Sequence, residues 1–211
     1  MKVAIVGGTG SFGRALATRL IDAGVDVVIG SREESRAVEA ARELGAAGGA
    51  DNARAVREAD LAVLAVKADA ALDTARELAA ELGDTPLLSV AAELRFSRDG
   101  VRPREDELSL AERVAELVDA PVAAGLHSLA AANLGADRAP DEDALVCGDD
   151  ARAKELALEL AGRVVSGHAV DAGPLASARA LEGLTAVIVN VNRRYRAHAG
   201  IRVTGLGDVS G

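Results

Sequence analysis

Met1-Lys-Val-Ala-Ile-Val-Gly-Gly-Thr-Gly-Ser-Phe-Gly13 opens the chain, and this stretch runs a short apolar strand straight into a cluster of glycines. Gly8, Gly10 and Gly13 have the spacing G-x-G-x-x-G. Such glycines form a tight turn, let a pyrophosphate approach the backbone, and let a helix pack closely on a strand. A helix starting near Ser11 would present its free N–H groups to the phosphates. Because the glycines follow a predicted strand and precede a predicted helix, the stretch predicts a dinucleotide-binding turn.

A second spacing also fits this cluster. Gly7, Gly10 and Gly13 satisfy G-x-x-G-x-x-G, which is the pattern of short-chain dehydrogenases and their non-catalytic relatives. The catalytic members need a Tyr-x-x-x-Lys pair for proton transfer. The chain's one tyrosine is Tyr195, and Ala199 stands where the lysine is needed. The sequence therefore excludes a catalytic short-chain dehydrogenase.

The end of the second predicted strand, Val27-Val-Ile-Gly-Ser-Arg32, indicates which dinucleotide binds. NAD-binding domains usually place Asp or Glu there for the ribose 2′-hydroxyl, whereas arginine suits a 2′-phosphate. This chain has Ser31 and Arg32, with Arg36 about one helical turn further on. Guanidinium groups pair with phosphate oxygens in a bidentate way. The acidic pair at 33–34 suits the start of the next helix. We predict NADP(H) rather than NAD(H).

Strands and helices alternate along the chain. Apolar runs predict strands at residues 2–6, 26–30, 61–66, 86–90, 121–125, 144–147 and 164–170. Helices are expected at residues 11–23, 33–45, 52–58, 69–82, 106–118, 150–162 and 174–198, with a turn at the Gly48-Gly49 pair. This alternation predicts an α/β fold, a doubly wound Rossmann-type parallel sheet with a C-terminal helical extension. We divide the chain into an NADP-binding domain, residues 1–170, and a C-terminal helix and tail, residues 171–211.

The composition narrows the class of protein. The 211 residues carry a formal charge of −9, which argues against nucleic-acid binding. Aromatic residues make up 1%, so the core must consist of Ala, Val, Leu and Ile. Cys147 is the one cysteine; we expect it to be buried, and no metal-ligand spacing joins it to the histidines. No apolar run approaches the ~20 residues that span a bilayer. We expect a soluble cytoplasmic protein, and the acidic, lysine-poor, alanine-rich composition fits a salt-adapted cytoplasm.

Two regions depart from this regular alternation. The segment from Glu93 to Glu105 is a basic stretch in an acidic chain, with arginines at 95, 98, 102 and 104. It follows the fourth predicted strand, at the edge of the sheet where ligands bind, so it is either a basic lid over an anionic substrate or a solvated loop.

The second is the C-terminal helix. It follows Asp171-Ala-Gly-Pro174, where Pro174 suits the first helical position and Asp171 the cap. One face of this helix carries an apolar stripe that must be covered. The stripe consists of Leu184, Val187, Ile188, Val191 and Tyr195. The helix either folds over the sheet edge or pairs with a second subunit, and we favour a homodimer.

Four segments together resemble the archaeal and actinobacterial F420-dependent NADP oxidoreductases. They are the glycine cluster at 7–13, Gly30-Ser-Arg32, Val146-Cys-Gly-Asp-Asp150, and Asp171-Ala-Gly-Pro-Leu175 with Arg179, Glu182, Leu184-Thr185, Ile188 and Asn190. The same domain type occurs in the cytoplasmic part of certain membrane metalloreductases. The resemblance implies hydride exchange between C4 of the nicotinamide and C5 of the 8-hydroxy-5-deazaflavin of coenzyme F420. Because both reactants are cofactors, the protein needs to position the two rings and does not need to supply a nucleophile or a metal.

The resemblance also implies roles for single residues. NADP would be held by Thr9, Ser11, Phe12, Ser31, Arg32 and Arg36. The family's His-Thr-Ile-Pro-Ala segment matches His127-Ser-Leu-Ala-Ala131. His127 and Leu129 would border the deazaflavin, with His127 as a hydrogen-bond donor to its polar edge; the alternative for His127 is a satisfied histidine at a strand end.

The chain departs from the family at two places. Val66-Lys67-Ala68 stands where Ile-Pro-Trp is common, and Ala130 replaces a proline. Lys67 then faces either the pyrophosphate or an acidic substrate, or else is solvated.

These observations leave three hypotheses. The leading one is an NADPH:F420 oxidoreductase, with the basic segment meeting the anionic, phosphate-containing tail of the deazaflavin. The second is an NADPH-dependent reductase of another acceptor, a flavin or a ferric chelate. The third is a non-catalytic NADP(H)-sensing protein.

Overall fold

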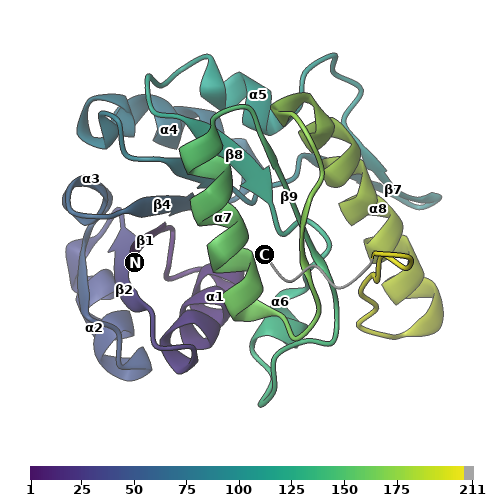
Figure 1. Ribbon diagram of the computed structural model, residues 1–211, viewed down its shortest axis with the longest axis horizontal. Helices are drawn as coiled ribbons and strands as arrows, with labels where there is room; N and C mark the ends of the chain where they lie inside the picture. Colours follow the sequence, from purple (N-terminus) through teal and green to yellow (C-terminus); the bar gives the residue numbers. More distant parts are fainter. Residues whose placement is uncertain (207–211) are drawn as a thin grey trace.

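The computed structural model describes residues 1–206, which form an eight-stranded sheet covered by helices on both faces (Figure 1). In spatial order the strands are β10 (Ala169–Asp171), β9 (Ala144–Gly148), β8 (Val122–Gly125), β5 (Leu87–Ser89), β4 (Leu61–Leu64), β1 (Lys2–Val6), β2 (Asp26–Ser31) and β3 (Gly48–Asp51). A separate antiparallel hairpin consists of β6 (Leu94–Ser97) and β7 (Gly100–Pro103). The helices are α1 (Ser11–Asp22), α2 (Glu34–Leu44), α3 (Asn52–Arg57), α4 (Ala68–Leu82), α5 (Leu110–Ala115), α6 (Ala131–Leu134), α7 (Ala151–Val164), the 3₁₀ helix η1 (Leu175–Ser177) and α8 (Ala178–Tyr195).

The sheet confirms the predicted doubly wound, Rossmann-type architecture. Strands β3, β2, β1, β4, β5 and β8 are parallel, β9 pairs antiparallel with β8, and β10 is parallel to β9. The chain leaves β1 toward β2 on one side and returns to β4 on the other. This change of direction places a crevice at the carboxyl ends of β1 and β4, where such sheets bind ligands.

Alternating side chains of the central strands fill two separate cores. Val3 and Ile5 pack with α1, α2 and α7, whereas Ala4 and Val6 pack with α3, α4 and α5 on the other face. A strand buried on both faces needs a continuous apolar run, which explains why β1 has no polar positions after Lys2. Apart from Cys147, the buried core residues are Ala, Val, Leu and Ile, as predicted, and Phe12 is partly buried against them. Cys147, in β9, is fully buried, and burial raises the pKa of its thiol to about 12.

The prediction of a turn at Gly48-Gly49 was wrong, because this pair lies in β3 and pairs with β2. A Cβ at Gly49 would overlap the carbonyl oxygen of Ala37 in α2. Glycine is therefore needed at this position for the close approach of strand and helix, rather than for a turn.

The C-terminal boundaries also differ from prediction. Helix α7 continues to Val164, so the strand expected at 164–170 is shortened to β10. Pro174 is not the first helical residue, because it precedes η1, and α8 begins only at Ala178. Asp171 accepts a hydrogen bond from the Gly173 N–H, and the N–H of Leu175 is bound by Asp149 instead.

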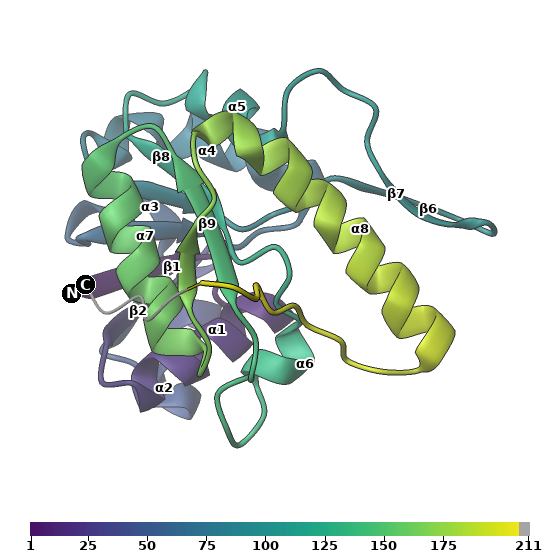
Figure 2. The ribbon, with the colours of Figure 1, turned by 45° about the vertical axis from the view of Figure 1, so that its right-hand side comes forward.

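Helix α8 lies across the side of the sheet, against β7 and α5, and the chain beyond it returns toward β9 (Figure 2). The N–H of Asp143 donates to the carbonyl of Ile201, and its carboxylate accepts from the N–H of Val203. The last part of the predicted 171–211 segment, residues 207–211, lies outside the described residues. The domain boundary at residue 170 remains a prediction.

Candidate functional site

A cleft of about 910 Å³ opens at the carboxyl ends of β1, β2 and β4. Its lining contains seven of the nine residues predicted to bind the dinucleotide: Thr9, Gly10, Ser11, Phe12, Ser31, Arg32 and Arg36. The remaining two, Gly8 and Gly13, shape the turn beneath the cleft. The first helix and the second strand, which are separate in the sequence, therefore contribute to one site.

The glycine turn has the close contacts that its spacing predicts. The N–H of Gly8 donates to the carbonyls of Ile5 and Gly30, both at 3.0 Å, which joins the ends of β1 and β2. Gly7 has a φ of +79°, a conformation that favours glycine. A Cβ on Gly13 would lie 2.7 Å from the carbonyl oxygen of Gly7, so helix α1 can approach the turn only with glycine there. Both candidate spacings thus contain structurally required glycines.

The N-terminus of α1 is a suitable anion site. No side chain caps this helix, and its first turn holds no acidic residue. Ser11 and Phe12, its first two residues, line the cleft. Uncapped N–H groups and the positive end of the helix dipole therefore face the space where a pyrophosphate would lie.

The end of β2 offers a second anion site. Ser31 is buried, and its Oγ accepts a hydrogen bond from the N–H of Glu33 at 3.3 Å. Arg32 is exposed and forms no ion pair within residues 1–206. Arg36 pairs with Glu33 at 3.4 Å, a contact between exposed groups that contributes little. Of the two arginines predicted to bind the 2′-phosphate, Arg32 is thus the one that has no ion pair within residues 1–206.

Helix α4 contributes acidic groups to the cleft. Three carboxylates of α4 line it, those of Asp69, Asp73 and Glu77, and Lys67 lies at the start of the same helix. An anionic group therefore meets favourable charge at β2 and at Lys67, and repulsion along the rest of α4. Lys67 lines the cleft and is exposed, so its roles toward the pyrophosphate, toward an acidic substrate or as a solvated residue stay predictions.

His127 and Leu129 follow β8 at the same edge of the sheet, but they do not line the described cleft. Both are 6% exposed. The residue before them, Leu126, has a φ of +63°, which is unusual for a residue with a Cβ and often accompanies functional sites. Their predicted roles beside the deazaflavin remain predictions.

Within residues 1–206, His127 leaves one ring nitrogen free, and its contacts indicate which one. Its Nε2 lies 3.3 Å from the carbonyl oxygen of Ala91, an acceptor, so the ring carries its proton there. Burial lowers the pKa of His127 to about 4, which keeps the ring neutral at pH 7. Its Nδ1 is buried without a hydrogen-bond partner in the described chain. A neutral ring with Nε2–H offers Nδ1 as an acceptor.

Long-range contacts hold the His127 segment in place. Thr185 of α8 donates from its Oγ1 to the carbonyl of His127 at 2.8 Å. On the other side, Arg19 of α1 donates to the carbonyl of Leu134, at 3.1 Å from Nη2, and also to that of Ala136. The sequence indicated no role for Thr185 or Arg19. Thr185 lies in one of the segments that resemble the family, and the signal for Arg19 was a charged residue beside the apolar Leu20 and Ile21.

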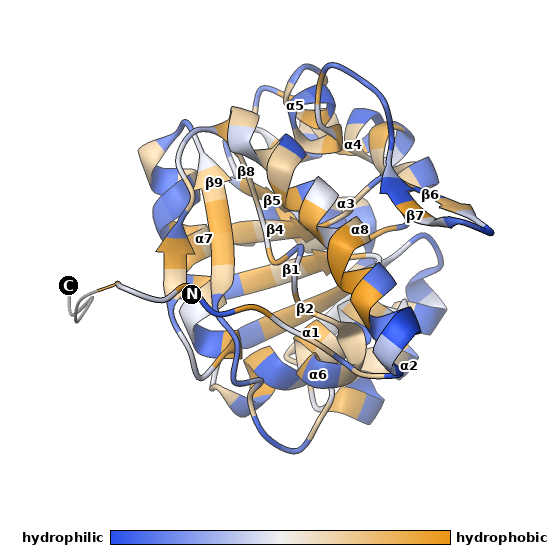
Figure 3. Ribbon diagram, turned by 90° about the vertical axis from the view of Figure 1, so that its right-hand side faces the viewer, coloured by the Kyte–Doolittle hydropathy of each residue, from blue (hydrophilic) through white to orange (hydrophobic). Residues whose placement is uncertain are grey.

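The basic segment is a hairpin rather than a loop, and it projects from the body of the molecule (Figure 2). Asn190 of α8 fixes it: its Oδ1 accepts from the Val101 N–H at 2.8 Å and its Nδ2 donates to the Val101 carbonyl at 2.7 Å. In the hydropathy view the hairpin is largely hydrophilic, whereas α8 shows apolar stretches along its length (Figure 3).

The arginines of this segment fall into two groups. Arg104 is paired with Glu93 and Asp106, at 2.5 and 2.7 Å. The other three, at positions 95, 98 and 102, are exposed and form no ion pair within residues 1–206. Arg104 therefore stabilises the base of the hairpin, and its outer part carries the free positive charge.

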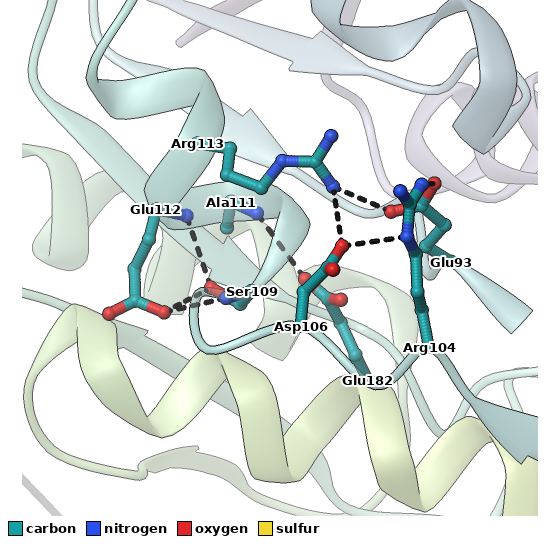
Figure 4. A network of polar contacts seen from close by, with 8 residues as sticks. All are labelled: Glu93, Arg104, Asp106, Ser109, Ala111, Glu112, Arg113 and Glu182. Carbon is teal, nitrogen blue, oxygen red and sulfur yellow. Dashed lines mark hydrogen bonds and ion pairs between the residues drawn. The ribbon is translucent and has the colours of Figure 1, made fainter.

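A polar network joins the base of the hairpin to α5 and α8 (Figure 4). Arg113 bridges Glu93 and Asp106, at 2.7 and 3.5 Å. Glu182 of α8 is 6% exposed and accepts a hydrogen bond from the Ala111 N–H at 3.3 Å. Burial raises the pKa of Glu182 to about 7, against the lowering effect of the N–H groups at the start of α5. These contacts connect the base of the hairpin and α8 to α5.

Residues 1–206 lack two kinds of feature. None of the helices is long and apolar enough to cross a membrane. No cluster of three or more His, Cys, Asp or Glu side chains could hold a metal ion.

Known proteins share both the sequence and the fold. The family model for coenzyme F420-dependent NADP oxidoreductases matches residues 2–93. The F420-dependent NADP reductase of Methanothermobacter marburgensis is 35% identical over 98% of this chain and 99% of its own length. That of Methanocaldococcus jannaschii is 32% identical, with the same coverage of both chains. A crystal structure from Arthrobacter sp. FB24 has 25% identity and a TM-score of 0.82 over 97% of this chain and 99% of that one. The chain belongs to the family of F420-dependent NADP reductases.

Proposed function

We propose that the protein exchanges a hydride between NADP(H) and the deazaflavin coenzyme F420. The observation that carries this proposal is the cleft, which combines an uncapped helix N-terminus with a strand end that bears Ser31 and Arg32. The acceptor is that of the F420-dependent NADP reductases to which nearly the whole chain is similar.

The residues of the cleft fit NADP. A side chain at Gly8 or Gly13 would fill the turn, which leaves the backbone open to a pyrophosphate. Thr9, Gly10, Ser11 and Phe12 would hold that group. Ser31, Arg32 and Arg36 would hold the 2′-phosphate, because guanidinium and hydroxyl groups donate to phosphate oxygens.

The deazaflavin would lie between this cleft and the His127 segment. When both coenzymes are bound, the hydride passes between C4 of the nicotinamide and C5 of the deazaflavin. The protein's contribution is to place the two rings and to exclude water. His127 would accept a hydrogen bond at Nδ1 from the polar edge of the deazaflavin, and Leu129 would support the ring.

The outer hairpin would meet the anionic tail of the same substrate. Its unpaired arginines, at 95, 98 and 102, are positive groups in a chain of formal charge −9. Such a patch attracts an anion selectively, and salt weakens the attraction.

The exposed face of α8 supports a homodimer. Val187 is 55% exposed and Tyr195 71%, on the apolar stripe that the sequence places on this helix. A second copy of the chain would cover them. Light scattering at several concentrations tests this: a mass near twice 21.4 kDa is expected, and a monomer throughout would contradict it.

Two further parts of the proposal concern the environment. We place the protein in the cytoplasm and attribute its acidic, lysine-poor surface to adaptation to salt. Stability should then fall in dilute buffer, whereas a flat stability curve up to molar KCl would exclude salt adaptation.

Activity is tested by mixing the purified protein with NADPH and oxidised F420 and following the loss of deazaflavin absorbance. Turnover at the rates of ordinary enzymes supports the proposal. Turnover only with a flavin or a ferric chelate would assign another acceptor. Tight NADPH binding without any turnover would make the protein a sensor of NADP(H).

A further inference from the structure

Asn52 is a buried polar residue that the fold does not use. It is the first residue of α3, is 8% exposed and lines the dinucleotide cleft. Its Oδ1 is buried and has no hydrogen-bond partner within residues 1–206. Native proteins rarely leave such an atom unpaired without a functional reason.

The amide has no evident structural role. The cap of α3 is supplied by Asp51, whose Oδ1 accepts from the Arg54 N–H at 2.9 Å. The Asn52 side chain lies against β2, where a Cβ on Gly30 would be 2.9 Å from its Oδ1. An apolar side chain of similar size would fill this space without an unpaired polar atom.

Its position is next to the predicted 2′-phosphate site. Strands β2 and β3 pair in parallel, with Ser31 opposite Asp51, so Asn52 is the residue directly beyond the partner of Ser31. Asn52, Ser31 and Arg32 all line the cleft. The acidic residues Asp69, Asp73 and Glu77 of α4 line the same cleft.

We propose that Asn52 is a specificity-determining residue that hydrogen-bonds the 2′-phosphorylated ribose of NADP. This rests on the proposed NADP site. The amide donates from Nδ2 to the phosphate and offers Oδ1 to the adjacent ribose hydroxyl, which satisfies the unpaired acceptor. A neutral amide suits this position, because a carboxylate would repel the phosphate and accept from the 2′-hydroxyl of NAD instead.

The test measures the affinities of the purified protein for NADPH and NADH by calorimetry, together with the thermal stability of the protein without cofactor. Asn52→Leu should weaken NADPH binding by about tenfold or more, the loss of one hydrogen bond to a charged group, while NADH binding changes less. The melting temperature should stay equal or rise, since an unpaired buried atom is removed. Asn52→Asp, which has nearly the same shape, should shift the preference further toward NADH.

The control is Ser89→Ala, which removes another buried polar group that has no hydrogen-bond partner within residues 1–206. Ser89 lies at the end of β5, three strands from β2, so its loss should leave the NADPH-to-NADH ratio unchanged. Unchanged NADPH affinity in both Asn52 variants, or equal losses for the two cofactors, would overturn the proposal. These binding measurements are independent of F420 turnover, so failure of the proposed reaction would be seen separately.

Discussion

The two ends of the proposed site are built in different ways. The dinucleotide end consists of backbone turns and neighbouring residues, such as Gly8, Gly13 and Ser31. The deazaflavin end depends on side chains that meet from distant parts of the chain: Thr185 with His127, and Asn190 with Val101. The first end is therefore fixed by local geometry, whereas the second depends on how α8 is held in place.

The most direct way to break the dinucleotide end is Gly13→Ala. The added Cβ would lie 2.7 Å from the Gly7 carbonyl oxygen and 2.8 Å from the Cα of Gly8, and neither backbone atom can yield easily. We expect NADPH affinity to fall at least about a hundredfold, equivalent to about 2.7 kcal/mol, as measured by calorimetry. Gly48→Ala is the matched control, because its Cβ would meet nothing within 4 Å. Normal binding by the Gly13 variant would contradict the assignment of the turn.

Arg32→Ala tests the charge at the same end. Loss of a bond between a guanidinium and a phosphate should weaken NADPH by about ten- to a hundredfold, with a much smaller effect on NADH. Arg36→Ala should lower the affinity for NADPH less than Arg32→Ala does, because Arg36 already pairs with Glu33. Dissociation constants for both cofactors check this. Equal losses for NADPH and NADH would refute the 2′-phosphate site.

The pKa of Glu182 makes the packing of α8 depend on pH. Burial raises the pKa from 4.5 to about 7, so between these values the folded protein binds a proton that the unfolded chain does not. The contribution of this protonated carboxyl to the free energy of unfolding is therefore complete below about pH 4.5. It is lost as the pH rises to about 7, and the whole loss is at most about 3 kcal/mol. Glu93 and Glu112 act in the same direction on this pKa. Urea unfolding across this pH range checks it: Glu182→Gln should remove this part of the pH dependence, and an unchanged profile would contradict it.

Thr185→Val tests the link between α8 and the His127 segment. The substitution keeps the shape but leaves the His127 carbonyl without its donor, and the segment should become less well placed. We expect the KM for F420 to rise by about three- to tenfold, the effect of one neutral hydrogen bond, and the affinity for NADPH to stay the same. Steady-state kinetics in which F420 and NADPH are varied separately distinguish an effect on F420 from an effect on NADPH. A parallel loss of NADPH affinity would show that the two ends are not independent.

The same contrast explains what the sequence could predict. The strand–glycine–helix order and the Ser31-Arg32 pair are local patterns, and the fold and the lining of the cleft followed from them. The hairpin was expected as a loop, because Arg95 and Arg102 face solvent across its strands and leave no apolar alternation. The hydrogen-bonding role of His127 depends on a carbonyl of residue 91, which no spacing rule connects to it. No sequence pattern pointed to Asn52, because the proposal for it rests on a buried Oδ1 atom that has no hydrogen-bond partner within residues 1–206.

The smallest expected effect concerns the hairpin arginines, and it tests how far the deazaflavin end extends. Replacing Arg95, Arg98 and Arg102 together by Gln should lower kcat/KM for F420 by about three- to tenfold at low salt, with kcat unchanged, because exposed charges mainly steer association. The difference should vanish near molar KCl. A deazaflavin without the anionic tail should not distinguish the variant from the native protein. Replacing the exposed residues Arg42, Arg152 and Arg163 by Gln gives the same net charge. An equal loss in that control would assign the effect to overall charge, and the substrate end would then stop at the His127 segment.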